Sequence, residues 1–205
     1  SIKVNQSTIL SKSLRSFPEK WHGLKDKETR FRQRYLDLIV NPESKKILET
    51  RSQVIKLIRE YLHENSFVEV ETPILQTKAG GAIAKPFKTH HNALGLDMYL
   101  RIAPELYLKR LIIGGFEKVF ELGKIFRNEG IDQTHLPEFT MLESYQAYVD
   151  ANSVMDMVED MCIYVFKNLE TDTKLHFGEN TADFSGPWKR VSMFDMVSEK
   201  LNIDI

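Results

Sequence analysis

The sequence predicts an α+β fold with a mainly antiparallel sheet flanked by helices. Predicted helices and strands occur in blocks rather than in strict alternation, which favours this class. The two longest predicted strands, residues 116–129 and 137–149, are separated by only seven residues, so they should pair as an antiparallel hairpin. A length of 205 residues suits one good-sized domain, alone or with part of another.

The N-terminal segment is expected to connect two domains. Residues 1–16 begin with an alternating pattern that is typical of a strand, but this strand has no partner nearby in the sequence. We therefore expect it to be the last strand of a preceding domain. Residues 17–40 are polar and basic and contain the breakers Pro18 and Gly23, so we expect a linker that leads into a short helix.

Residues 41–205 are expected to form the main domain. Pro42 and Glu43 are typical of a helix start, and the apolar residues that follow recur at helical spacing. A short strand at 67–72 should end at Pro73. The other elements expected in this part are a long loop at 74–97, a strand at 98–103, a helix at 104–114, the hairpin, and helices at 153–169 and 190–201.

Composition argues against several kinds of protein. The net charge of −1 predicts no strong nonspecific attraction of the whole chain to nucleic acid. No apolar run approaches the roughly 20 residues that a membrane-spanning helix needs, and the first residues do not resemble a signal peptide. Cys162 is the only cysteine, so the chain has no internal disulfide, and a reducing compartment, the cytoplasm, is expected.

Ionisable and aromatic side chains concentrate around the predicted hairpin. Residues two apart on a strand share a face, so Arg127 and Glu129 should point the same way, as should Phe139, Glu143 and Tyr145. An arginine fork suits a phosphate or a carboxylate, a phenyl face suits a flat base, and a carboxylate suits an amine. The pattern therefore predicts a pocket for a phosphate-bearing ligand with an amine. Cross-strand ion pairing on a solvated face is the alternative, and spacing alone does not separate the two.

Three features outside the hairpin have a structural and a functional interpretation. Glu105 stands at a predicted helix start, where a carboxylate more often stabilises the helix terminus than binds a ligand. Gly80 and Gly81 form either a simple turn or a place where the backbone approaches a ligand closely. The pair His90-His91 lies in the predicted loop without a nearby cluster of cysteines or carboxylates, so we expect no metal site there.

Two motifs resemble those of the class II aminoacyl-tRNA synthetases. FRNEG at 126–130, followed by HLPEFTMLESYQAY at 135–148, resembles motif 2, and FVEVETPIL at 67–75 resembles motif 1. Within this class the chain is similar to the lysyl-tRNA synthetase family over nearly its whole length. The synthetases for aspartate and asparagine usually have Gln, within SPQ, where this chain has Glu105 within APE. The segments that carry the lysine-specific similarity are WHGLKDKETRFRQRYLDLI at 21–39, the stretch 80–130 and PWKRVSMFDMV at 187–197.

This resemblance implies a fold, a reaction and partners. The fold would be the class II synthetase catalytic core, with residues 41–205 as its first part and residues 1–16 as the last strand of an OB-type anticodon-binding domain. The reaction would be ATP-dependent activation of L-lysine to lysyl-adenylate, followed by transfer of the lysyl group to tRNA(Lys). The family forms homodimers, with Pro73 at the interface, and uses Mg²⁺.

The resemblance also implies a role for each residue that matches a family motif. Arg127 would bridge the lysine carboxylate and the α-phosphate of ATP, and it is the expected catalytic residue. The expected ATP-binding residues are Arg127, Glu129, His135 and Phe139, with Phe139 stacked on adenine and Glu129 near its amino group. The expected lysine-binding residues are Gly81, Glu105, Arg127, Glu143 and Tyr145.

One part of the family pattern has no counterpart in this chain. Motif 3, with a second arginine, and the acidic Mg²⁺ ligands are not found in the sequence, so we expect the chain by itself to be inactive. Two alternatives to a lysine–tRNA ligase therefore remain open. One is a catalytically inactive, synthetase-derived module for dimerisation or RNA binding. The other is a paralogue that lysylates a protein, which the linker remnant at 17–40 disfavours because such paralogues lack the OB domain.

Overall fold

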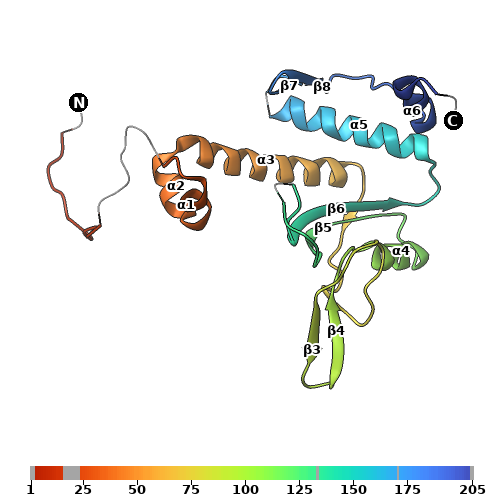
Figure 1. Cartoon of the computed structure of the whole chain (residues 1–205), viewed down its shortest axis with the longest axis horizontal. Coiled ribbons are helices and arrows are strands. Elements are labelled where there is room, and N and C mark those ends of the chain that lie inside the picture. Colours follow the sequence, from red (N-terminus) through yellow and green to blue (C-terminus); the bar gives the residue numbers. More distant parts are fainter. Residues whose placement is uncertain (1–2, 16–23, 133, 170, 204–205) are drawn as a thin grey trace. The chain divides into compact units, whose positions relative to one another are not determined.

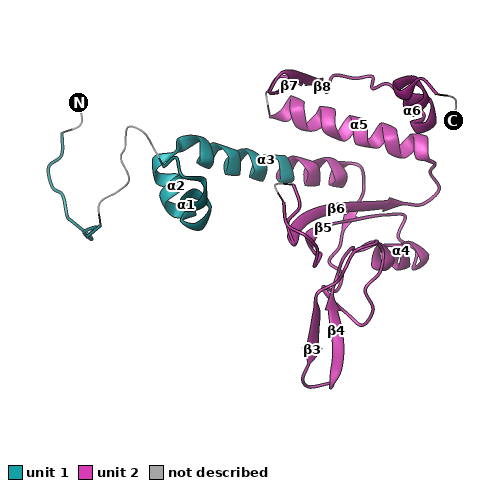
Figure 2. Cartoon of the chain, viewed as in Figure 1, with its two compact units in different colours: residues 1–55 teal, residues 56–205 magenta. Residues whose placement is uncertain are grey.

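The computed structural model describes residues 3–15, 24–132, 134–169 and 171–203. The chain divides into two compact units, residues 1–55 and 56–205, which we treat separately (Figure 2). Part of the predicted linker, including Pro18 and Gly23, lies outside the described residues.

The first unit is helical from residue 27 onward. Residues 3–15 contain no helix or strand, so their assignment to a preceding domain stays a prediction. The linker prediction allowed for one short helix, whereas its described part forms two. These are α1 (Lys27–Arg32) and α2 (Arg34–Val40), followed by α3 (Pro42–Glu64), whose residues fall in both units.

A buried carboxylate holds the short helices of the first unit together. The Asp37 side chain is fully buried, and its Oδ1 accepts hydrogen bonds from Arg30 Nε at 2.6 Å and Asn41 Nδ2 at 2.7 Å. Its Oδ2 accepts from Arg34 Nη1 at 2.7 Å. Hydrogen bonds from Asn41, Ser44 and the two arginines hold the pKa of Asp37 well below its ordinary value. The basic residues of this segment are thus partly used for structure.

The second unit is built on a three-stranded sheet. Its order is β1-β5-β6, in which β1 is parallel to β5, and β5 and β6 form the predicted antiparallel hairpin (Figure 1). The α+β prediction is therefore confirmed. The strands are β1 (Val68–Glu69), β5 (Lys118–Phe126) and β6 (Glu138–Gln146).

Aromatic and aliphatic side chains form the core beside this sheet. Leu62, Phe67 and Phe120 are buried together, and Met157 and Tyr164 of α5 (Ala151–Asn168) pack against them. The Tyr61 hydroxyl donates to the Met157 carbonyl at 3.2 Å, so its one polar atom is satisfied at the edge of the core. This core holds the inner part of the β5–β6 hairpin in place, and the loop end of the hairpin extends beyond the core.

A second antiparallel sheet replaces much of the long loop predicted at 74–97. Its order is β2-β4-β3, with β2 (Leu75–Gln76), β3 (Lys88–His91) and β4 (Leu96–Leu100). The loop interpretation of His90 and His91 is therefore wrong, because both lie in β3. The reason is local pairing: β3 pairs residue by residue with β4, and His90 Nδ1 lies 2.8 Å from Asp97 Oδ1 across it. Among the described residues, no group of three or more potential metal ligands occurs.

The remaining elements complete the second unit. Helix α4 (Glu105–Ile113) follows Pro104 as predicted and packs on β5 and β6. A hairpin that the sequence analysis did not predict is formed by β7 (Lys174–Phe177) and β8 (Asn180–Asp183), and α6 (Met193–Leu201) begins after the cap Ser192. No helix in the described part of the chain has the length and apolarity to cross a membrane.

Candidate active site

The two strands of the hairpin are shorter than predicted. Strand β5 ends at Phe126, so Arg127 and Glu129 lie beyond it rather than on it. Arg127 still pairs across the hairpin, because its N–H donates to the Pro137 carbonyl at 2.9 Å. The next N–H, from Asn128, donates instead to the Lys85 carbonyl at 2.7 Å. This change of partner ends the strand and turns the chain toward another loop.

The predicted face of the second strand is confirmed. Opposite pairs in the register are Ile125 with Phe139, Glu121 with Glu143, and Val119 with Tyr145. Phe139, Glu143 and Tyr145 are even numbers of positions apart along β6, so they share one face of the sheet. The same alternation places Arg127, opposite Pro137, on this face at the end of the hairpin.

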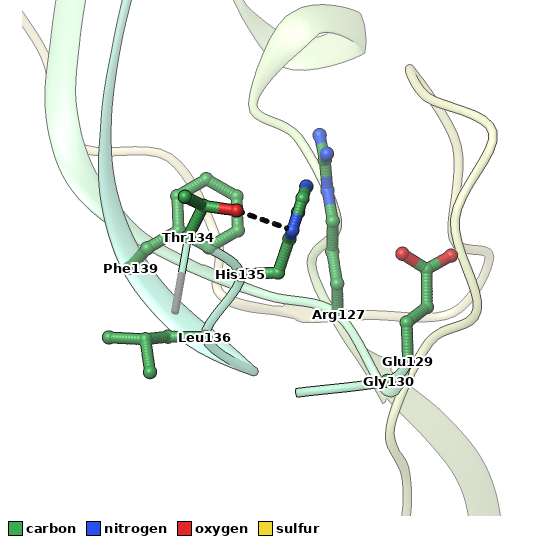
Figure 3. Close-up of a pocket in the computed structure, with 7 residues that line it drawn as sticks. All are labelled: Arg127, Glu129, Gly130, Thr134, His135, Leu136 and Phe139. Atoms are coloured by element: carbon green, nitrogen blue, oxygen red, sulfur yellow. Dashed lines mark hydrogen bonds between the residues drawn. The ribbon is translucent and has the colours of Figure 1, made fainter. Parts of the chain in front are cut away.

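A cavity of about 310 Å³ lies at the hairpin end. Figure 3 shows its lining, in which the Arg127 and Glu129 side chains extend from the same side of the chain. All the residues expected around ATP are brought together here. The residues that line it are Arg127, Glu129, Gly130, Thr134, His135, Leu136 and Phe139.

Arg127 occupies the inner wall of this cavity. Its Nε and Nη2 donate weakly to the Ile102 carbonyl, at 3.4 and 3.5 Å, and its Cζ lies 5.2 Å from the centroid of the Phe139 ring. Within the described ranges, no carboxylate lies within ion-pair distance of Arg127. The guanidinium therefore keeps donors for an anionic ligand.

The other polar residues of the cavity are held by neighbouring groups. Glu129 Oε1 accepts a hydrogen bond from the Lys85 N–H at 3.1 Å. His135 Nδ1 lies 2.8 Å from Asp132 Oδ2 and 3.0 Å from Thr134 Oγ1. The backbone N–H of Thr134, helped by His135, lowers the pKa of Asp132, so this carboxylate stays ionised beside the imidazole.

Glu105, Glu143 and Tyr145 form a cluster near Arg127, which we call the acidic pocket. The Tyr145 hydroxyl donates to Glu143 Oε2 at 3.1 Å. Burial raises the pKa of Glu143, and the charge of Glu105 raises it further, while Arg127 lowers it. Burial and Glu143 raise the pKa of Tyr145 well above its ordinary value. Cations of the protein do not fully neutralise these two carboxylates. The cluster is therefore negative and suits a cationic ligand.

Gly81 approaches this acidic pocket through its backbone. Its φ is +88°, and a Cβ at this position would lie 2.9 Å from the Cβ of Glu105 and 3.2 Å from that of Ala103. Real Cβ atoms do not approach this closely, and L side chains rarely adopt this φ. The geometry therefore requires a glycine here, next to Glu105 and Ala103. The approach of this backbone to a ligand stays a prediction.

Glu105 has an ion-pair partner that the sequence analysis did not predict. It lies in the first turn of α4, as predicted, and its Oε1 forms an ion pair with Lys109 Nζ at 2.7 Å. This lysine lies one turn further along the same helix, so the pair contributes little to stability. A ligand ammonium could replace the Lys109 ammonium without loss of a buried bond.

Sequence reasoning missed a buried ion pair behind the acidic pocket. Arg101 and Glu121 are almost fully buried, and Arg101 Nη1 donates to Glu121 Oε1. Thr72 contacts both side chains. The sequence held a signal of this pair. Glu121 interrupts an apolar strand between Phe120 and Leu122, where burial of an unpaired carboxylate would strongly destabilise the fold.

Pro73 follows Thr72 and is exposed. Its neighbours Ile74 and Leu75 are large apolar residues that remain more than 40% exposed. The expected place of Pro73 at a dimer interface stays a prediction.

Comparison with known proteins identifies the family. The sequence model of the class II tRNA synthetases (D, K and N) matches residues 26–204. The chain belongs to this family. The resemblance of motifs 1 and 2 to those of class II synthetases is thereby confirmed, and so is the fold class.

Curated relatives within this family are lysine–tRNA ligases. The chain is 54% identical over 204 residues to the enzyme of Thermoanaerobacter sp. (strain X514), and 55% identical over 205 residues to that of Thermotoga maritima. Identity to the Clostridium tetani enzyme is 53% over 204 residues. Each match covers 100% of this chain and 41% of the relative, so the chain spans about two fifths of the length of these relatives.

The arrangement in this class II synthetase chain suits the joining of two anions. Arg127 contacts Phe139, and it lies on the same face of the hairpin as Glu143, whose pKa its charge lowers. A guanidinium in this position can neutralise both an α-phosphate and a carboxylate. The acidic pocket can hold the ammonium of the molecule that supplies the carboxylate.

Proposed function

We propose that this chain is part of a lysine–tRNA ligase, which activates L-lysine with ATP and transfers it to tRNA(Lys). The observation that carries the proposal is that Arg127, which contacts Phe139, shares one face of the hairpin with Phe139 and Glu143. The names of the curated relatives support the same activity.

The first step would join a carboxylate oxygen of lysine to the α-phosphorus of ATP. The bond from this phosphorus to the bridging oxygen of the β-phosphate breaks, and pyrophosphate leaves with the electron pair. Because nucleophile and electrophile are both negative, neutralisation of charge is the main task of the protein. Arg127 would do this with its planar fork, bridging the carboxylate and the α-phosphate.

The nucleotide would occupy the cavity at the hairpin end. Phe139 would stack on adenine, and Glu129 would accept a hydrogen bond from the adenine amino group with the carboxylate oxygen that Lys85 leaves free. His135, held by Asp132, would lie near the phosphates, where a protonated imidazole favours negative charge.

The amino acid would occupy the acidic pocket. Glu105 and Glu143 would bind the α-ammonium, the backbone of Gly81 would approach the same end, and Tyr145 would lie toward the side-chain amine. Lysine carries two positive charges, so it benefits more than a neutral amino acid from these carboxylates. Transfer to tRNA(Lys), homodimer formation through the region of Pro73 and a cytoplasmic location belong to the same proposal.

Mg²⁺ is expected to accompany ATP in the full-length gene product, as the family resemblance implies. Among the described residues, no group of three or more His, Cys, Asp or Glu that could hold a metal occurs, but Mg²⁺ bound with ATP commonly needs only one or two protein carboxylates. No step above depends on the metal.

Lysine-dependent exchange between ATP and pyrophosphate tests the proposal. We would measure it on the full-length gene product, with lysine, aspartate and asparagine as competing substrates. We expect exchange with lysine alone, and about a 100-fold loss in Glu105→Gln, as when one electrostatic contact is removed from an active site. Glu117→Gln, which changes an exposed carboxylate of the same unit, is the control. Exchange with aspartate or asparagine, or none with any of the three, would contradict the proposal and favour another substrate or an inactive module.

A further inference from the structure

Two glutamates lie directly opposite one another on the face of the hairpin that carries the acidic pocket. Glu121 of β5 pairs with Glu143 of β6 in the register. Directly opposite residues in an antiparallel pair have Cβ atoms about 4.5–5.5 Å apart, and like charges in such positions repel. Two ionised carboxylates in this position destabilise one another unless neighbouring groups offset the repulsion.

The two carboxylates differ in their partners. Glu121 is buried, its Oε1 accepts from Arg101 Nη1, and its Oε2 accepts from the Thr72 N–H at 3.2 Å and the Thr72 hydroxyl at 2.6 Å. Glu143 is half-buried and accepts a hydrogen bond from Tyr145 at 3.1 Å. Charge and hydrogen bonds are therefore concentrated on Glu121, the more deeply buried member of the pair.

Arg101 is fixed from several directions. Its Nε donates to the Lys124 carbonyl at 2.9 Å, and its Nη1 also donates to the carbonyl and the hydroxyl of Thr72, at 3.2 and 3.1 Å. Its Nη2 lies where a Cβ of residue 123 would be, so only a glycine there leaves room for the guanidinium. A side chain held in this way cannot turn to pair with Glu143 instead.

The backbone of the same residue supports the catalytic arginine. The Arg101 N–H donates to the Ile74 carbonyl at 2.9 Å, and its carbonyl accepts from the Phe126 N–H at 3.1 Å. Phe126 immediately precedes Arg127, whose guanidinium lies against the carbonyl of Ile102. Arg101 thus contacts the elements that present both the arginine and the acidic face.

We propose that Arg101 is a positioning residue that holds Glu121 against Thr72 and so keeps Glu143 as the carboxylate available to the ligand's ammonium. This inference rests on the proposed function for the identity of the ligand, but not for the behaviour of the two glutamates. Arg101 contacts no substrate in this proposal, and it acts through the neighbouring charge.

Arg101→Met tests it in the full-length gene product. Without the guanidinium, the negative charge of Glu121 is no longer offset, while Thr72 still donates two hydrogen bonds to its Oε2 and favours its ionised form. Glu143, which faces this charge, should therefore take up a proton more readily. We expect the KM for lysine to rise about tenfold, the effect of losing one charged contact, while the KM for ATP changes by less than about threefold. The acidic limb of the pH profile of kcat/KM for lysine should move to higher pH.

A double variant separates positioning from a merely structural role. In Arg101→Met/Glu121→Gln both buried charges are absent, a change that proteins often tolerate. We expect the pH profile and the lysine KM to return to within about threefold of wild type, because Glu143 no longer faces a charged neighbour. Arg59→Met, which breaks the ion pair with Glu69 elsewhere in the unit, is the control and should leave both readouts unchanged.

A measurement that needs no activity decides the same point. Carboxyl-carbon NMR of protein labelled at glutamate can follow the titration of Glu143, identified by the signal lost in Glu143→Gln. We expect this titration to move up by about one pH unit in Arg101→Met and back in the double variant. If Arg101→Met does not fold, Thr72→Val, which removes one hydrogen bond to Glu121, replaces it with a smaller upward shift expected.

Two results would overturn the inference. One is an unchanged Glu143 titration in the folded single variant. The other is a lysine KM that rises in the single variant and stays raised in the double variant, which would indicate general damage to the sheet. Absence of lysine-dependent exchange in the wild-type protein would contradict only the proposed function. The inference about Arg101 could still be tested, because the Glu143 titration would still be measurable.

Discussion

The guanidinium carbon of Arg127 lies 5.2 Å from the centroid of the Phe139 ring. At this distance a cation is attracted by the face of an aromatic ring. The contact brings the group proposed to bind phosphate next to the group proposed to bind the base. A nucleotide in the cavity would have to share the Phe139 ring with Arg127 or displace the guanidinium toward the phosphate.

Arg127→Lys should fail almost as badly as Arg127→Ala. An ammonium keeps the charge but cannot reproduce the planar fork that would bridge carboxylate and phosphate. We expect a loss of at least about 100-fold in lysine-dependent exchange for both variants, measured on the full-length gene product. Near-wild-type exchange by Arg127→Lys would contradict the role assigned to Arg127. A solvated hairpin without a site would show almost no change in rate.

Phe139→Ala should weaken ATP binding with little effect on lysine. Stacking of a base on an aromatic ring contributes about 1–3 kcal/mol, which corresponds to a rise in the KM for ATP of roughly 5- to 150-fold. The KM for lysine, measured at saturating ATP, should change by less than about threefold. Phe139→Tyr retains a ring and is the matched control. Equal rises in both KM values for Phe139→Ala would point to collapse of the hairpin instead.

Gly81→Ala should raise the KM for lysine. The added Cβ would meet the Cβ of Glu105 at 2.9 Å, and the positive φ adds about 1–2 kcal/mol of strain. We expect at least a tenfold rise in the lysine KM, because the clash would displace the Glu105 side chain that is proposed to bind the ammonium, whereas the backbone strain would mainly lower stability. Gly95→Ala is a matched control, because Gly95 also has a positive φ but nothing within 4 Å of the added atom. A similar rise in the control would remove the steric explanation.

Glu143→Gln should make the protein more stable near pH 7 while it abolishes lysine binding. Burial raises the pKa of Glu143 in the folded chain above its ordinary value of 4.5. The ionised carboxylate therefore opposes folding above that raised pKa, and the opposition disappears below about pH 4.5, where both states are protonated. We expect the Tm difference between variant and wild type to be positive at neutral pH and to vanish toward pH 4. A difference independent of pH would contradict this account.

The full-length gene product should be a homodimer. Ile74 and Leu75, next to Pro73, remain exposed as large apolar residues, and a twofold interface would bury them. Sedimentation at micromolar concentration should give the mass of two chains. Ile74→Glu should shift it toward one chain, whereas Ile131→Glu, at an exposed apolar residue near the nucleotide cavity, should not. A wild-type monomer would count against the prediction.

The sequence predicted which side chains share a face better than it predicted the course of the backbone. The period of two along β6 correctly placed Phe139, Glu143 and Tyr145 on one face, because side chains alternate in any regular strand. The strand end was misplaced for a tertiary reason. Asn128 donates to Lys85, more than forty positions earlier in the chain, and no local pattern reports such a bond.

The buried pair Arg101–Glu121 illustrates a second limit. Glu121 lies on β5 and Arg101 directly follows β4, so the two residues are 20 positions apart and no local pattern reports their pairing. Gly123 was a usable sign, since a glycine inside a strand often marks the close approach of another group. The strands at 88–91 and 174–183 were missed because their residues are largely polar and exposed, and their pairing decides their structure.

Both backbone groups of Lys85 are bonded to the end of the hairpin, the N–H to Glu129 and the carbonyl to the Asn128 N–H. Neither bond involves the Lys85 side chain. Any amino acid except proline, which lacks the N–H, could make the same two contacts. A substitution that keeps the N–H would therefore leave both contacts in place, although this main chain ties the loop beside the acidic pocket to the nucleotide cavity. Substitution tolerance is thus a poor guide to importance at this position.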